Sequence, residues 1–203
     1  DVIDLREARS ERDRRHADPA PRRMSDAFGP FHARHRVLLE VTLYVATAVG
    51  AWSVRFVQDD AFISFRYARN LAQGRGLVFN PGERVEGYTN FLWTLLMAIP
   101  ERLGWSTPLF SQIVGIVCAL ATVAVAKWLA AKVLGDGARA YLVAVVLVTN
   151  MTFLSYATGG LETMLQTLLV TAAIGLLLPL DAERVRRLRL RQLGAGIVGG
   201  LAL

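Results

Sequence analysis

The sequence has very little of the chemistry that cysteine and histidine supply. Its single cysteine, Cys118, excludes an internal disulfide and a metal site built from several thiolates. The three histidines, His16, His32 and His35, all precede the first long apolar stretch. A histidine-ligated metal in the apolar body of the protein is therefore excluded as well. The long apolar stretches also contain few ionisable residues, which argues against an ion-conducting path through them.

What the chain does contain is apolar residues in long blocks. Hydrophobic residues make up 53% of its 203 residues, and the blocks are of the length that crosses a bilayer, about 20 residues each. The formal net charge is +6, but the basic residues cluster at the ends of the apolar blocks, as membrane topology requires. The predicted class is an all-α integral membrane protein whose partner is the lipid bilayer, and nucleic acid is excluded as a partner.

The predicted organisation is a polar tail followed by a multi-span helical bundle. Residues 1–36 form a polar, Arg-rich tail, and residues 37–203 form the N-terminal part of a transmembrane domain. The fifth apolar block is too short to span, so we expect the chain to be a truncated part of a longer membrane protein. The predicted spans are residues 37–57, 108–131, 140–156, 161–180 and, incomplete, 192–203.

The arginine distribution predicts the topology. The apolar segment Phe91–Pro100 has only ten residues, which suits a re-entrant or interfacial helix rather than a span. If it does not cross, the tail and the Arg-rich segment after residue 180 lie on the cytoplasmic side, as the positive-inside rule prefers. The N-terminus is then cytoplasmic, and residues 58–107 form a large extracytoplasmic loop.

This loop is predicted to carry an amphipathic helix on the outer membrane surface. The helix begins at Asp60 and ends at Gly74 and Gly76, because glycine favours the backbone conformation that terminates helices. Trp93 and Trp105 are interpreted as interfacial anchors. The predicted apolar face consists of Ala61, Phe65, Ala68 and Ala72, and the residues expected to lie away from it are Ser64, Tyr67 and Asn70.

Two adjacent carboxylates, Asp59 and Asp60, stand where the first span is expected to leave the bilayer. One of them can cap the following helix, but a cap needs only one side chain. A pair of carboxylates can also supply a general base, or bind a divalent cation through oxygen ligands. A divalent cation is the one cofactor that these residues allow, and the residue types leave its presence open.

The segment Asp59–Trp93 resembles the first external loop of membrane glycosyltransferases of the GT-C type, which use polyprenyl-phosphate sugars. It is most similar to the actinobacterial terminal arabinofuranosyltransferases. The residues that carry the likeness are DDAFISFRYARNLA, the segment NPGERVEGYTNFLW that follows, and the later ATGGLET at 157–163, which has one more glycine than the family segment. The resemblance implies a multi-pass plasma-membrane protein with a GT-C-like fold and further spans.

The resemblance also implies the reaction and the residues that carry it. The expected reaction is the inverting transfer of a sugar, with arabinofuranose the expected one, from a polyprenyl-phosphate donor to a cell-wall glycan acceptor on the outer face. Asp60 or Asp59 is the expected catalytic base. The expected substrate-binding residues are Arg66, Arg69, Glu86, Tyr88 and Glu162, with the arginines suited to gripping phosphate.

Each of these assignments has an alternative. The arginines can pair with lipid headgroups, Glu86 and Tyr88 can pack the loop, and Glu162 can favour a helix N-terminus by its charge. At the level of function, the alternatives are a related polyprenyl-phosphate mannosyltransferase and a non-catalytic transporter or scaffold fragment. The gathering of charge in the loop rather than in the spans favours an enzyme over a transporter.

Overall fold

The structure is a computed structural model that describes residues 24–83, 85–135, 137–178, 195 and 198–201. Contacts divide the chain into two units, residues 1–41 and 42–203. No strand occurs among the described residues, as expected for an all-α protein. The helices are α2 (Met24–Ser53), α3 (Ala61–Ala72), α4 (Phe91–Leu103), α5 (Thr107–Leu134), α6 (Gly137–Thr149), α7 (Met151–Tyr156) and α8 (Thr163–Leu177).

Unit 1 contains, among its described residues, the first part of α2, so the end of the predicted polar tail is helical.

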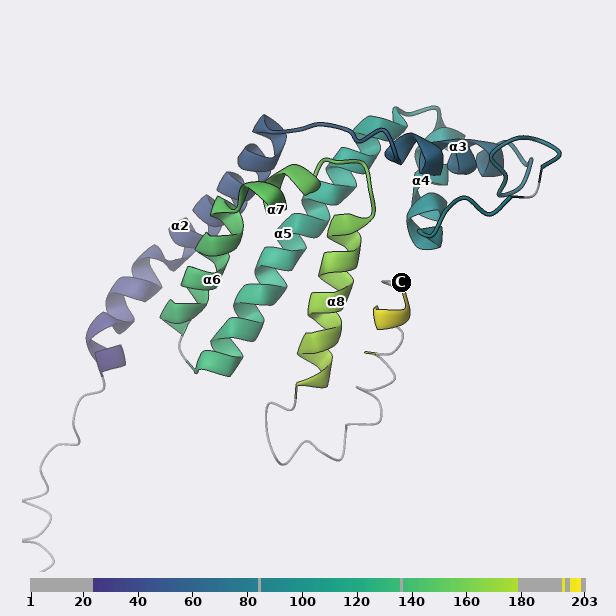
Figure 1. Ribbon diagram of the computed structural model, residues 1–203. Coiled ribbons are helices and arrows are strands. Elements are labelled where there is room, and N and C mark those ends of the chain that lie inside the picture. The colour runs from purple at the N-terminus through teal and green to yellow at the C-terminus, as the bar shows by residue number, and fades with distance from the viewer. Residues whose placement is uncertain (1–23, 84, 136, 179–194, 196–197, 202–203) are drawn as a thin grey trace, which may run out of the picture. The chain divides into compact units, whose positions relative to one another are not determined.

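In unit 2, α5 contacts both α6 and α8, and Figure 1 shows it running between them. Small residues allow the close approach of these elements. A Cβ on Gly175 of α8 would lie 3.0 Å from the Trp128 ring of α5, and a Cβ on Gly115 would collide with the backbone carbonyl of Ala157.

The apolar core of the bundle lies along the inner faces of these helices. Cys118, Ala119 and Val123 of α5 pack there with Ala144 of α6 and Met164 of α8. Their outer faces carry exposed aliphatic side chains, so part of the apolar surface of unit 2 has no protein partner among the described residues. Those exposed side chains include Leu109, Ile113, Val117, Leu142, Val145, Val146, Val170, Ile174 and Leu177.

One described helix, α5, is long and apolar enough to cross a membrane. The apolar part of α2 (Val37–Ser53), α6 and α8 are apolar but shorter. The segment 140–156, predicted as a span, is not one continuous helix, because Asn150 separates α6 from α7. Its side-chain oxygen accepts a hydrogen bond from the Phe153 amide (2.9 Å), which makes it the N-cap of α7. The predicted fifth span, 192–203, lies largely outside the described residues.

At one end of α5, the α3–α4 pair forms a second core. Ala61, Phe65 and Ala68 of α3 pack against Trp93 and Met97 of α4. The helix α4 includes Pro100 and ends at Leu103, and the C-cap residue Gly104 that follows has a positive φ of 72°. These contacts hold α3 beside α4, so that polar side chains at the two helices lie close to one another.

The polar residues of α3 are not where the hydrophobic pattern placed them. Ser64, Tyr67 and Asn70 are buried, whereas the apolar residue Phe62 is 53% exposed. The cause is the following loop, because the Asn70 side-chain amide donates to the carbonyls of Val78 and Phe79, at 2.7 and 3.0 Å. Tyr67 likewise donates its hydroxyl to the Val85 carbonyl at 2.8 Å. A buried polar side chain satisfied in this way costs little to bury.

The two tryptophans assigned as interfacial anchors also differ. Trp105 is 59% exposed, whereas Trp93 is 1% exposed and donates its indole N–H to the Gly160 carbonyl at 2.9 Å. The anchor interpretation of Trp93 is therefore wrong. Its role is to join α4 to the segment between α7 and α8.

Candidate functional site

Asp59 and Asp60 lie immediately before α3, and both side chains are exposed. Neither caps the helix, because the amides of Ala61, Phe62 and Ile63 are satisfied by the backbone carbonyls of residues 58, 59 and 60 at 3.1 Å. The capping interpretation of the acidic pair thus has no hydrogen bond to support it. Among the described residues, both carboxylates are left open to solvent or to a ligand.

The Gly159–Gly160 turn lies directly against the start of α3. The backbone amide of Gln58 donates to the Gly159 carbonyl at 2.9 Å, and the Trp93 indole N–H donates to the Gly160 carbonyl. A Cβ added to Gly160 would lie 2.9 Å from the Cβ of Ala61, and its φ of +83° is one that other residues rarely adopt. Two sequence segments about a hundred residues apart therefore meet at the acidic pair.

A hydrogen-bond network continues this junction. Asn90 precedes α4, and its amide nitrogen lies 2.7 Å from a carboxylate oxygen of Glu162 and 2.9 Å from the Ser64 hydroxyl. Its amide oxygen accepts from the Thr94 hydroxyl at 3.1 Å. Ser64 lies in the first turn of α3, four residues after Asp60. Asn90 therefore links Glu162 to the helix that the acidic pair begins.

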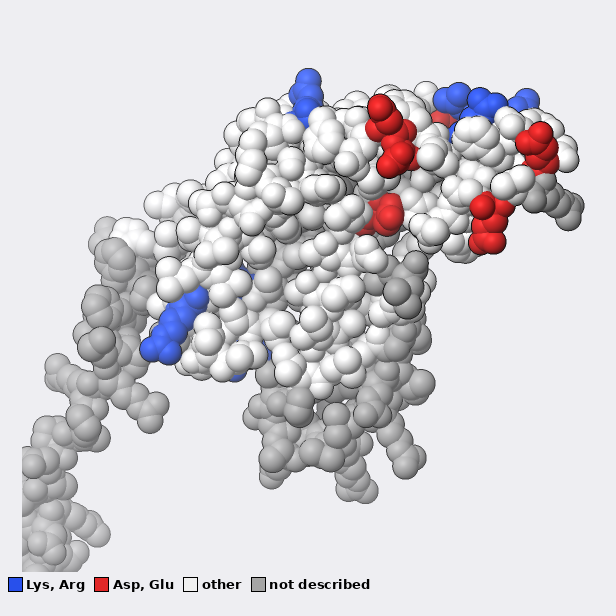
Figure 2. Space-filling view, in the orientation of Figure 1, with Lys and Arg blue, Asp and Glu red and all other residues white. Residues whose placement is uncertain are grey.

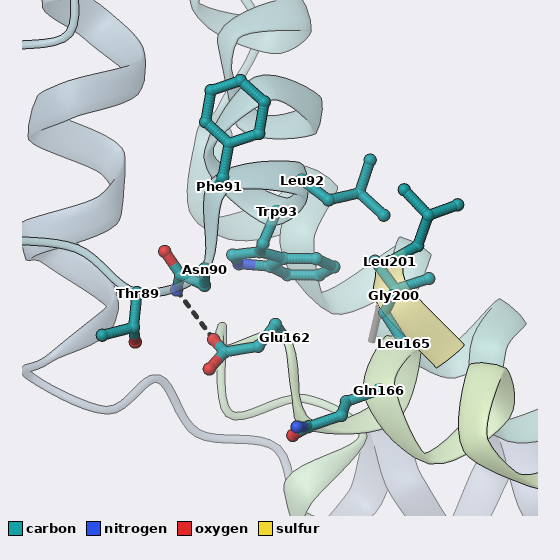
Figure 3. Close-up of a pocket in the computed structure, with 10 residues that line it drawn as sticks. All are labelled: Thr89, Asn90, Phe91, Leu92, Trp93, Glu162, Leu165, Gln166, Gly200 and Leu201. Atoms are coloured by element: carbon teal, nitrogen blue, oxygen red, sulfur yellow. Dashed lines mark hydrogen bonds between the residues drawn. The ribbon is translucent and has the colours of Figure 1, made fainter. Parts of the chain in front are cut away.

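A cavity of about 200 Å³ adjoins this network (Figure 3). Its polar lining comes from Thr89, Asn90, Glu162 and Gln166. Glu162 is the N-cap residue of α8, and Gln166 lies four residues later in the helix. Figure 3 shows Glu162 bonded to the Asn90 amide and Gln166 farther from Asn90, beyond Glu162. The apolar walls are formed by Phe91, Leu92, Trp93, Leu165, Gly200 and Leu201.

The two candidate arginines of α3 lie on its exposed face and are both engaged. Arg66 donates from Nε to the Phe79 carbonyl at 3.0 Å, and its guanidinium stacks over the Phe79 ring at 5.2 Å from the centroid. Arg69 forms an ion pair with Glu101 of α4, Nε to Oε2, at 3.0 Å. Glu101 also accepts from the Thr107 hydroxyl at 2.6 Å. Figure 2 shows basic and acidic side chains gathered over the α3 and α4 region.

Glu86 and Tyr88 lie on a second cavity, of about 370 Å³, which also has Arg75 in its lining. The Tyr88 ring packs on Tyr67 with centroids 4.7 Å apart, and the Glu86 side chain is exposed. A Cβ on the intervening Gly87 would lie 2.8 Å from the Tyr67 hydroxyl. Tyr88 is thus packed in the loop, and Glu86 projects outward from it.

The structure therefore brings Glu162 to the start of α3 and leaves Glu86 and Tyr88 around a separate cavity. Reasoning from the sequence missed Asn90 and Glu101 as partners of the candidate residues. Asn90 stood inside the quoted segment NPGERVEGYTNFLW, but an asparagine before a helix is ordinarily a cap, so nothing singled it out. In the chain as described, no three or more His, Cys, Asp or Glu side chains are grouped closely enough to hold a metal ion.

Comparisons with known proteins point to one group of relatives. No family model and no solved structure matches the chain. A terminal beta-(1->2)-arabinofuranosyltransferase of Mycobacterium tuberculosis is 46% identical over 55 residues, which are 27% of this chain and 9% of the relative. One of Corynebacterium glutamicum is 50% identical over 42 residues, which are 21% of this chain and 6% of the relative. The matches thus span less than a tenth of each relative. Over its N-terminal part, the chain resembles the arabinofuranosyltransferase family.

Proposed function

We propose that this chain forms part of a membrane glycosyltransferase that transfers an arabinofuranosyl group from a polyprenyl-phosphate donor to a cell-wall glycan acceptor, with inversion. Two relatives named as arabinofuranosyltransferases support glycosyl transfer of arabinose at the level of the family. The observation that carries the proposal is the meeting of the two segments that resemble this family. The Gly159 carbonyl accepts from the backbone amide of Gln58, just before the acidic pair, and the Glu162 carboxylate accepts from Asn90 in the same loop.

In this proposal Asp60 is the general base, and Asp59 assists it. Asp60 accepts the proton of the acceptor hydroxyl while that oxygen forms a bond to the anomeric carbon of the donor. The bond between this carbon and the phosphate oxygen breaks, and polyprenyl phosphate leaves with the electron pair. A carboxylate that is exposed and unused by the helix cap is available for such a role. If a divalent cation takes part, Asp59 and Asp60 are the residues that would bind it.

The proposal assigns the leaving phosphate to the exposed face of α3. Arg66 and Arg69 supply positive charge there, and arginine binds phosphate oxygens in a bidentate geometry. Arg66 is oriented by its bonds to the loop at Phe79 and Asn80, and Arg69 is oriented by Glu101. A guanidinium held by one edge keeps donor groups on its other edge. The two arginines are thereby pre-organised rather than occupied.

The proposed setting is the plasma membrane, with α5 as a span, the apolar parts of α2, α6–α7 and α8 in the same bilayer, and a cytoplasmic N-terminus. The loop 58–107 then faces outward, and α3 lies at the level of the lipid headgroups. A polyprenyl chain stays in the bilayer while its phosphate reaches that level. The exposed aliphatic side chains of α5, α6 and α8 support this setting, because they would face lipid.

The test is sugar transfer by the full-length protein carrying Asp60→Asn or Asp59→Asn. Loss of a general base lowers the transfer rate by about 10²-fold or more, so Asp60→Asn is expected to do so without loss of helicity. Glu83→Gln, which neutralises an exposed carboxylate in the turn at residues 80–83, is the matched control. Arabinose and mannose donors are compared in the same assay. Wild-type rates in both Asp variants would refute the catalytic role of the pair, and a preference for the mannose donor would refute the assigned sugar.

A further inference from the structure

The cavity beside Glu162 differs in charge from the exposed face of α3. Among the described residues, its lining contains one carboxylate, two side-chain amides and one hydroxyl, and no lysine or arginine. An anionic phosphate is repelled by such a lining, because the nearest charge has the same sign. The arginines that suit a phosphate lie instead on the exposed face of α3 and pair with Phe79 and Glu101.

The same lining suits a neutral ligand with several hydroxyl groups. A carboxylate accepts short, charge-assisted hydrogen bonds from hydroxyls, and amide side chains both donate and accept. Only one Glu162 oxygen is bonded to Asn90, and Figure 3 shows the other directed away from that bond. Asn90 itself is held by Ser64 and Thr94, so it fixes the Glu162 carboxylate in one orientation.

The size of the cavity suits a small ligand. Its volume of about 200 Å³ lies below the roughly 300–1,000 Å³ of pockets that take drug-sized ligands, so it fits one sugar ring better than an extended glycan. The walls formed by Leu92, Trp93 and Leu165 can cover the apolar C–H face of such a ring. The indole N–H of Trp93 is already used by Gly160, so Trp93 contributes surface rather than a hydrogen bond.

We propose that this cavity binds one neutral sugar unit through its hydroxyl groups, with Glu162 as the main acceptor and Asn90 as its positioning residue. The proposal rests on the proposed function, since it divides the substrates between two places: neutral sugar beside α8 and phosphate on α3. The sugar can come from the glycan acceptor or from the donor. Both sources present the same hydroxyl chemistry, so the experiment is designed to separate them.

The experiment measures binding without turnover, by saturation-transfer NMR and calorimetry on the full-length protein in detergent. The probes are an arabinofuranosyl disaccharide glycoside and a short-chain polyprenyl-phosphoarabinose. Glu162→Gln keeps the size of the side chain but removes its charge, and Gln166→Trp fills the cavity from an exposed position. Glu83→Gln is again the charge-matched control. Each cavity variant is expected to weaken one probe about tenfold, which corresponds to about 1.4 kcal/mol.

Weakening of the disaccharide alone assigns the cavity to the acceptor, and weakening of the phosphoarabinose alone assigns it to the donor sugar. Either result supports the proposal, provided that Glu83→Gln binds both probes as the wild type does. Unchanged affinity for both probes in both cavity variants overturns the proposal, as does wild-type protein that binds neither. Sugar binding without any transfer would retain the cavity assignment while refuting the proposed enzymatic function.

Discussion

Gly160 combines two constraints, because a side chain there would meet packed atoms and its φ is positive. Substitution by alanine adds a Cβ 2.9 Å from the Cβ of Ala61, 3.2 Å from Val57 Cγ1 and 3.4 Å from Phe65 Cζ. These atoms belong to backbone-proximal or packed side chains, so they cannot move aside without shifting α3. Overpacking of this kind costs about 1–3 kcal/mol. The φ of +83° adds about 1–2 kcal/mol for a residue with a Cβ.

The expected loss for Gly160→Ala is therefore about 2–5 kcal/mol in the free energy of unfolding. Substitutions at two other glycines separate the cost of the steric contacts from the cost of the backbone conformation. Gly159→Ala meets only ordinary contacts, at 3.7 Å or more, and is expected to change stability by less than about 1 kcal/mol. Gly104→Ala meets nothing within 4 Å but has a φ of +72°, so it isolates the backbone cost, about 1–2 kcal/mol.

The measurement is equilibrium denaturation in mixed detergent micelles, followed by far-UV circular dichroism. The expected order of destabilisation is Gly160→Ala, then Gly104→Ala, then Gly159→Ala. Equal stability of the Gly160 and Gly159 variants would refute the reasoning, because it would mean that the turn does not pack on α3 as described. Equal losses for Gly160 and Gly104 would show that backbone conformation alone matters at this turn.

Three further predictions concern the network, the arginines and the topology. Asn90→Ala removes hydrogen bonds to two hydroxyls and one carboxylate and is expected to destabilise unit 2 by about 1–3 kcal/mol in the same denaturation assay; no change would mean that the network is not formed. Arg66→Lys and Arg69→Lys keep the charge but lose the bidentate geometry, so we expect the donor KM to rise about tenfold at an unchanged acceptor KM. Wild-type kinetics in these variants would leave the arginines as anchors of α3. In a background without the native cysteine, Gln73→Cys is expected to react with an impermeant maleimide in intact cells and Gly137→Cys is not; the reverse pattern would overturn the topology.

Helix positions were largely predictable from the sequence. The period of apolar residues after Asp60 and the glycines at 74 and 76 predicted a helix there, and α3 occupies Ala61–Ala72. The apolar block from residue 108 likewise corresponds to α5. Both signals are local, since they depend on residue spacing and on the conformational freedom of glycine. The extent of such helices can therefore be derived without knowledge of their partners.

The buried face of α3 could not be predicted in this way. A hydrophobic pattern ranks side chains by their affinity for water, so it placed Tyr67 and Asn70 on the solvent side. Their burial depends on carbonyl groups of residues 78, 79 and 85, which the fold supplies from a loop. The break at Asn150 was missed for a related reason. Averaged hydropathy hides one polar residue in an apolar run, although that residue caps a helix.

The candidate site was predicted in part. The acidic pair and Glu162 were singled out, and the structure links the segments that carry them through Asn90 and Gly160. The ion pair of Arg69 with Glu101 joins residues on two different helices, and no pattern in the sequence relates them. Residue types suggested which groups could act on a phosphate or a hydroxyl. Which of those groups share a space depends on long-range packing.

The hydrogen bonds of Asn90 and Trp93 can form only late in the synthesis of the chain, because their partners are added much later. Asn90 and Glu162 are 72 residues apart, and Trp93 and Gly160 are 67 apart. At a synthesis rate of about 5–20 residues per second, the ribosome adds Glu162 roughly 4–14 seconds after Asn90. During that interval α3 and α4 can pack on each other, because their shared core is built from residues 61–97. The carboxylate of Glu162 arrives last, so a nascent chain stalled before residue 160 would present the acidic pair without the turn that packs against it.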